Sequence, residues 1–435
     1  MPVLLTKLKQ LAEKIQKTLS SADNMLWLWA VIAAAALLLF YLLTGVPGKG
    51  STLVFAQWWE DELEEGVLEK LVKDFEEEHP GIKVQLEKKS RQEIKAALSG
   101  AEEQVRGKKR RSADIFSVEG GWADDAGGGL AALDESLFLK KSPYTPRNFL
   151  PPPSPEETGN RALPVISFIN PLFYNIELLR TAGFDRPPKN QTEFLSYVQA
   201  ITKPERGIYG AVLALGEENS LGISRHVLSW IWSAGIQDGA FDFGSKQVVE
   251  SLAFLNQLKP YLYPDFFSTD EETRLDIFIG GKAGMMIGSV SDVKKLRERM
   301  KQDFSITTIP GPALYVGKPV FALSSWYAGI GAESEKREEA TEFIAFLLEH
   351  ASELADGAFA VPGNGDRNPE LINTDPYYSK AYDMYDAGEM VRELYGTGRA
   401  RKLNAVIYEE LKRMFEGQSP ENTAAAIQSR WENIQ

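Results

Sequence analysis

The sequence contains no cysteine and only three histidines among its 435 residues. The missing thiols exclude disulfide bonds, thiolate metal sites, a cysteine nucleophile and an anchor through a lipid-modified cysteine. His79, His226 and His350 are too widely separated for the spacing of metal ligands. The catalytic and phosphate-binding patterns HExxH, GxSxG and GxxxxGK[ST] do not occur either. We therefore expect no metal site and no cofactor, and a protein that is not an enzyme.

An excess of positive charge is also lacking, because the formal net charge is −13. The content of 43% hydrophobic and 25% charged residues is ordinary for a globular protein, and the length allows about two or three domains. Binding to nucleic acid needs a basic surface that neutralises phosphates. We therefore expect a folded, acidic protein that does not bind nucleic acid.

One long apolar run, residues 25–46, reads MLWLWAVIAAAALLLFYLLTGV and carries no charge. About 20 such residues span the hydrocarbon core of a bilayer. Four lysines precede the run and one follows it, which predicts a cytoplasmic N-terminus and an extracytoplasmic body. A cleaved signal peptide is the alternative. Residues 1–24 form a basic amphipathic segment, either a helix on the inner leaflet or a soluble leader, and residues 47–51 form a linker.

After the linker, β-like runs alternate with helical ones. Strands are predicted at 51–58, 82–86 and 113–118, with a helix at 61–79 and another from Arg91. This alternation predicts an α/β fold with a largely parallel sheet, in which ligands bind beyond the carboxyl ends of the strands. The α/β pattern restarts at 161–168. Further helices are predicted near 191–201, 221–235, 245–258, 271–280, 335–350, 399–416 and 420–434, and a returning strand within 316–330.

A series of motifs resembles the family 1 extracellular solute-binding proteins, the maltose-binding-like group. The motifs follow the order of that family along nearly all of 51–435. They are QWW after the first strand, DFEEEHPGIKV, ADIFSVEGGW, LAALD, ALPVISFINPLFYN, LLRTAGFDRPPKNQTEFL, FIGGKAGMMIGS, ITTIPG, EKREEATEFIAFLL and EGQSPENTAAAI. The chain departs from the pattern where many relatives carry a tryptophan after the GKAAM-like motif, because Ser289–Asp292 stands there. It departs again at Ser324–Trp326, where a glycine-rich stretch is usual.

The resemblance implies the type II periplasmic-binding-protein fold, with two discontinuous lobes joined by crossovers. One lobe would take 52–163 and 322–359, and the other 166–319 and 362–435. The implied function is to capture a sugar or oligosaccharide in a hinge cleft and to deliver it to the permease subunits of an ABC importer. A ligand-binding module for signalling or surface attachment is an alternative, as is a glycoside hydrolase.

Candidate ligand-binding residues follow the first and third strands. A sugar is bound by aromatic platforms and a few fixed polar groups, among which carboxylates form strong hydrogen bonds to hydroxyls. Trp58 and Trp59 would supply such platforms, and Glu60 follows them as a candidate acceptor. If the strand continues, only one of the two rings reaches the ligand. Glu119 precedes two glycines and Trp122. The alternatives are core tryptophans and solvated carboxylates.

Three more candidates lie later in the chain. Trp230 lies on a predicted helix, where core packing is the alternative, and Ser325 and Trp326 lie where the chain resembles a crossing strand of the family. Glu60 and Glu119 are also the pair that a glycoside hydrolase would use. With 61 acidic residues in the chain, such a pairing arises easily by chance. Acidic candidates disfavour an anionic ligand, which they would repel.

Overall fold

The computed structural model describes eleven stretches of the chain. They are residues 50–99, 113–119, 128–134, 138, 160–216, 222–234, 242–314, 320–363, 369–387, 389–392 and 400–433. The predicted membrane helix 25–46, the segment 1–24 and Trp122 lie outside the described residues. Within the described stretches, every helix is too short or too polar to cross a membrane.

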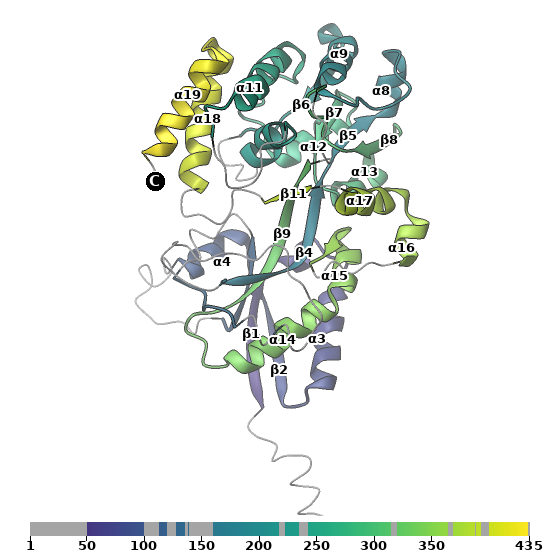
Figure 1. Cartoon of the computed structure of the whole chain (residues 1–435). Helices are drawn as coiled ribbons and strands as arrows, with labels where there is room; N and C mark the ends of the chain where they lie inside the picture. The colour runs from purple at the N-terminus through teal and green to yellow at the C-terminus, as the bar shows by residue number, and fades with distance from the viewer. Residues whose placement is uncertain are drawn as a thin grey trace, which may run out of the picture. The chain divides into compact units, whose positions relative to one another are not determined.

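The larger of two sheets has seven strands, in the order β10-β4-β9-β3-β1-β2, with β11 also pairing with β9. Figure 1 shows β4 and β9 running side by side, as their pairing from Ala162 to Asn170 requires. The strands are β1 (Ser51–Gln57), β2 (Ile82–Lys88), β3 (Ile115–Glu119), β4 (Ala162–Asn170), β9 (Val320–Ile330), β10 (Val361–Pro362) and β11 (Glu389–Arg392). The residues Ser51 and Thr52 belong with His79–Lys83 to a small unit of their own, in which the Ser51 N–H donates to the Gly81 carbonyl at 3.0 Å.

The prediction of a largely parallel sheet is wrong. β1 and β3 are parallel, as expected for strands joined through a helix. The strand β9, however, runs antiparallel to β3 and β4, although it is parallel to the short β11. The crossover rule applies only to strands joined by one crossover, and β9 follows β4 after a long insertion. Its direction was therefore not encoded in the local alternation of strands and helices.

That insertion carries the second sheet, whose order is β6-β7-β5-β8. Its first strand follows β4 with only Pro171 between them. The strand β5 is antiparallel to β7 and to β8, whereas β6 and β7 are parallel. The four strands are β5 (Leu172–Asn175), β6 (Tyr209–Val212), β7 (Ala283–Ile287) and β8 (Phe304–Thr307).

Helices bury the apolar side chains of the first sheet. Phe75 of α3 (Val67–Glu78) packs edge-on against Phe343 and Phe346, with ring centroids 5.0 and 5.4 Å apart. Phe343 also meets Phe55 of β1 at 5.8 Å. These rings join α3, α14 (Arg337–Glu349) and the sheet into one core, which α15 (Ala351–Ala358) extends (Figure 1). The helix α4 (Arg91–Leu98) contacts β3.

The second sheet has its own apolar core, in which Phe194, Leu252 and Ile407 are almost fully buried. Figure 1 shows α18 and α19 beside α11. The helices of this part are α8 (Ile176–Thr181), α9 (Gln191–Ile201), α10 (Ser229–Trp232), α11 (Lys246–Leu258), α12 (Glu271–Ile279), α13 (Asp292–Arg299), α16 (Pro369–Thr374), α17 (Pro376–Ala387), α18 (Ala400–Glu416) and α19 (Pro420–Glu432). The helices predicted at 191–201, 245–258 and 271–280 are confirmed to within one residue at each end.

Two predicted helices are divided in the structure. In place of one helix over 61–79, a 3-10 turn at 59–61 is followed by α3 from residue 67. Gly66 adopts φ +84°, a conformation that side-chain-bearing residues rarely take, and separates the two. The helix predicted over 221–235 is a π-helical turn, η5 (Ser224–Leu228), that continues into α10.

Candidate functional site

Three predicted tryptophans meet at the carboxyl end of β1. The rings of Trp59 and Trp326 are stacked, with centroids 5.7 Å apart and planes 14° apart. Trp58 meets Trp326 edge-on at 6.4 Å, and Phe168 of β4 lies 5.2 Å from the same ring. All three tryptophans are at most 4% exposed. They therefore form one aromatic cluster that joins β1, β4 and β9, and their rings pack on one another.

Trp58 and Trp59 were expected on opposite faces only if the strand continued, and it does not. The strand ends at Gln57, and Trp59 begins the 3-10 turn. The Gln57 side-chain carbonyl accepts the Glu60 N–H at 3.1 Å, which stabilises this change of direction. Because the chain turns before residue 59, both indoles pack against Trp326.

Arg91, the first residue of α4, connects this cluster to two carboxylates. Its guanidinium lies over the Trp58 ring, 5.0 Å from the centroid. One of its nitrogens makes a very short contact with Glu62, and its Nε is 3.7 Å from a carboxylate oxygen of Glu119. The side chains of Arg91 and Glu119 are 36% and 20% exposed, so both are accessible to solvent. Sequence reasoning missed Arg91, since nothing in its surroundings marks it apart from other surface arginines.

Glu119 ends β3, directly opposite Trp326 in the antiparallel register. Burial raises the pKa of its carboxyl above the ordinary range, while the nearby charge of Arg91 opposes that rise. Arg225 lies close enough to lower the same pKa, although it belongs to the π-helical turn beside the second sheet. Glu119 is thus a partly accessible acceptor among charged groups from both parts of the structure.

The other predicted residues have different surroundings. Ser325 is buried, and its hydroxyl lies 2.8 Å from the Ser167 hydroxyl across β4 and β9. The half-buried Glu60 uses its backbone N–H in the bond to Gln57. Trp230 is 1% exposed and packs against Phe194 and Phe254 in the second core, apart from the aromatic cluster.

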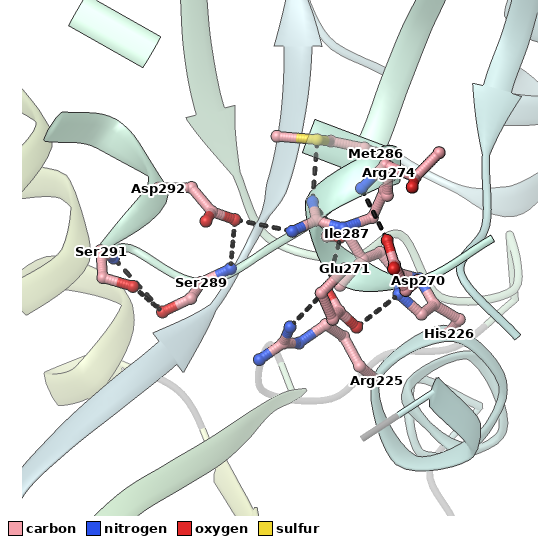
Figure 2. A network of polar contacts seen from close by, with 11 residues as sticks. Arg225, His226, Asp270, Glu271, Arg274, Met286, Ile287, Ser289, Ser291 and Asp292 are labelled. Atoms are coloured by element: carbon pink, nitrogen blue, oxygen red, sulfur yellow. Dashed lines mark hydrogen bonds and ion pairs between the residues drawn. The ribbon is translucent and has the colours of Figure 1, made fainter. Parts of the chain in front are cut away.

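A buried polar network centred on Glu271 lies beside the second sheet (Figure 2). One carboxylate oxygen is 2.6 Å from Arg225 NH1 and accepts a bond from Arg274 Nε at 2.9 Å. The other lies 3.2 Å from His226 Nε2. Three basic side chains from η5 and α12 therefore converge on one carboxylate, and Arg225, His226 and Arg274 are each at most 4% exposed.

Arg274 extends the network toward α13. Its NH2 donates to Asp292 Oδ2 at 2.8 Å, and its NH1 donates to the Ile287 carbonyl at 3.0 Å. The same Asp292 oxygen accepts the Ser289 N–H, which fixes the segment Ser289–Asp292 (Figure 2). The segment expected to depart from the family pattern is thus held by hydrogen bonds to Asp292.

The surroundings of Glu271 and His226 shift the pKa of each group. Burial alone would raise the pKa of Glu271, but Arg225 and Arg274 outweigh it and hold that pKa well below the usual range. Burial lowers the pKa of His226. These shifts favour an ionised Glu271 and an uncharged His226 at neutral pH. In the described stretches, no group of three histidine or acidic side chains is placed to hold a metal ion.

The comparisons with known proteins agree with this architecture. The model of the family named bacterial extracellular solute-binding protein matches residues 60–354. The chain belongs to this family. Its members bind solutes and are not enzymes, which confirms the prediction of a binding protein.

Particular relatives are distant. YcjN of Escherichia coli (strain K12), a candidate ABC transporter periplasmic-binding protein, is 26% identical over 54% of this chain. The alignment spans about half the length of that relative (54%). Among solved structures, maltose-bound MalE3 of T. maritima has a TM-score of 0.68 and 18% identity, over 88% of this chain and 100% of that one. UgpB of Mycobacterium tuberculosis with glycerophosphocholine has a TM-score of 0.69 and 17% identity, over 89% and 98%. The solute-binding protein thus has the periplasmic-binding-protein fold.

The helix that carries Arg91 begins with a capping box. The Ser90 hydroxyl accepts the Glu93 N–H at 3.3 Å, and the Glu93 carboxylate accepts the Ser90 N–H at 2.8 Å. We expect Ser90→Ala to lower the free energy of unfolding by about 1 kcal/mol, because a cap is lost. Urea denaturation followed by circular dichroism measures this. Ser99→Ala, at the other end of α4, is the control, and an equal loss there would contradict the role of the cap.

Proposed function

We propose that this solute-binding protein captures a neutral sugar or oligosaccharide and delivers it to the permease subunits of an ABC importer. Membership of the family supports solute binding outside the cytoplasm. The name of the E. coli relative supports the link to an ABC transporter. The apolar run at 25–46 supports a single-pass membrane anchor with the binding part outside the cytoplasm.

Two lobes would enclose the ligand. In this proposal one lobe consists of 52–163 and 322–359, and the other of 166–319 and 362–435. The two sheets support a division into two lobes, although β11, within 362–435, pairs with β9 of the first sheet. Closure of two lobes around a ligand is favoured when the closed form makes contacts that neither lobe makes alone.

The observation that carries the proposed ligand site is the accessible carboxylate of Glu119. It lies opposite Trp326 of the aromatic cluster, and its carboxylate oxygen is 3.7 Å from Arg91 Nε. A carboxylate is suited to accept two sugar hydroxyls. Trp58, Trp59, Glu60, Ser325 and Trp326 would support this site or contact the ligand, with Trp122 and Trp230 as further candidates.

The charges of the site favour a neutral ligand. Arg91 is already engaged by Glu62 and Glu119, and Arg225 by Glu271. An anionic ligand would have to compete with these carboxylates for the arginines, and like charges repel. A hydroxyl-rich neutral ligand instead adds hydrogen bonds without displacing an ion pair.

Calorimetric titration of the full chain tests the proposal. The panel contains maltose, longer maltooligosaccharides, simple monosaccharides and, as an alternative that carries a phosphodiester, the zwitterion glycerophosphocholine. We expect one-to-one binding of a sugar, weakened roughly 10- to 100-fold by Glu119→Gln, because a hydrogen bond to a charged group is lost.

Glu193→Gln is the matched control, since Glu193 is a carboxylate paired with Arg186 on the surface of α9. It should leave sugar affinity unchanged. Binding of glycerophosphocholine alone would overturn the assignment to sugars. Absence of binding across the panel would contradict the proposed function.

A further inference from the structure

Arg91 contacts Trp58, Glu62 and Glu119 together. The capping box of α4 fixes its backbone, since Ser90 is the residue immediately before it. The planar guanidinium is suited to this position because it can stack on a ring while its edge faces carboxylates. Through these contacts Arg91 links the Trp58 ring to the Glu119 carboxylate.

We propose that Arg91 is a positioning residue of the ligand site, which holds the Glu119 carboxylate against the face of the aromatic cluster as an ionised acceptor of ligand hydroxyl groups. The inference rests on the proposed function, because it assigns Arg91 a role at the same site. It adds a residue that neither the motifs of the sequence nor the comparisons indicate.

Arg91 affects the pKa of Glu119 more than the other charged residues around it do. Burial raises the pKa of Glu119, and among the opposing groups Arg91 has the largest effect. Glu62 acts in the same direction as burial, and Arg225 and Lys95 oppose it less than Arg91 does. Removal of Arg91 would therefore take away the largest opposing charge and raise the pKa of Glu119 further.

The direction of this pKa shift determines how ligand binding depends on pH. If ionised Glu119 accepts ligand hydroxyls, affinity falls as the pH drops through its pKa. In Arg91→Gln that fall should begin at a higher pH than in the unaltered protein. In Glu119→Gln the fall should disappear, because no group at that position titrates. A purely structural role of Arg91 would weaken binding at every pH without moving the profile.

The first measurement needs no ligand. The full chain is labelled with [δ-13C]glutamate, and the Glu119 carboxyl resonance is identified by its loss in Glu119→Gln. Its chemical shift is followed against pH in the unaltered protein, in Arg91→Gln and in Arg91→Lys. We expect a clear upward move in Arg91→Gln and a smaller one in Arg91→Lys, which keeps the charge. Lys95→Gln removes a charge from the same helix and is the matched control.

The second measurement is calorimetric titration of the same variants with maltose and with the other sugars of the panel between pH 5 and 8. We expect Arg91→Gln to lower affinity about tenfold, with the loss growing toward acidic pH. An unchanged Glu119 titration in Arg91→Gln, or a shift no larger than that of Lys95→Gln, would overturn the inference. If no sugar binds the unaltered protein, the proposed function fails and the assignment of Arg91 to a sugar site fails with it. The carboxyl titration then still shows whether Arg91 controls the charge of Glu119.

Discussion

Replacing Arg274 by alanine is expected to lower the free energy of unfolding by about 3–5 kcal/mol, the range for breaking a buried ion pair. The side chain is 1% exposed and donates to Glu271, Asp292 and the Ile287 carbonyl. Its loss leaves Asp292 and the Ile287 carbonyl without their guanidinium donor and removes one of the two arginines that pair with Glu271. Urea denaturation of the full chain, followed by circular dichroism, gives the change in stability.

A matched control lies on the same side of the second sheet. Arg299 of α13 pairs with Asp276 at 2.7 Å, but both side chains are about half exposed. Surface ion pairs contribute roughly 0–1 kcal/mol, so Arg299→Ala should change stability little. If Arg274→Ala destabilised the protein no more than Arg299→Ala, the network would not contribute to stability as its burial implies.

The second large effect is expected for Trp326→Ala, which should cost about 3–5 kcal/mol of stability, as for other buried aromatic residues truncated to alanine. The ring is the centre of the aromatic cluster, because Trp58, Trp59 and Phe168 all pack on it. Removal would leave a cavity between β1, β4 and β9. The free energy of unfolding is again measured by urea denaturation.

Trp230→Ala separates stability from ligand binding. Trp230 is as buried as the cluster tryptophans, yet it packs in the second core against Phe194 and Phe254. Both variants should lose similar stability. At a temperature where both remain folded, sugar affinity should fall more in Trp326→Ala, whose ring lies across from Glu119. Equal losses of affinity would argue against a special role of the aromatic cluster.

The elements of the fold could be predicted where the determining interactions are local. The helix over 191–201 is an example, because the Asn190 side chain accepts the Glu193 N–H and an apolar face follows at helical spacing. The direction of β9 could not be predicted, since its partners β3 and β4 are distant in the sequence. The same holds for the π-helical turn 224–228, whose charged residues are stabilised by Glu271 from another helix.

The candidate site was likewise predictable only where it depends on local sequence. Trp58 and Glu119 could be placed at strand ends because parallel neighbours end at one edge of a sheet, and β1 and β3 are such neighbours. The packing of Trp326 on Trp59 was not predictable, because it depends on the turn that begins after Gln57. Arg225 and Glu271 were missed for a similar reason. Each looks like a surface charge in a helix until tertiary structure joins them.

The position of β9 in the larger sheet also bears on how the chain folds. The strand lies between β3 and β4, yet it follows β4 only after the whole second sheet. Glu119 and its partner Trp326 are separated by about 200 residues, which at typical synthesis rates emerge roughly 10–40 s apart. During that time the edges of β3 and β4 that will pair with β9 have no partner. Such contacts between distant residues make folding slow. The first sheet therefore begins to form early and is completed late. The second sheet can form before β9 joins the first.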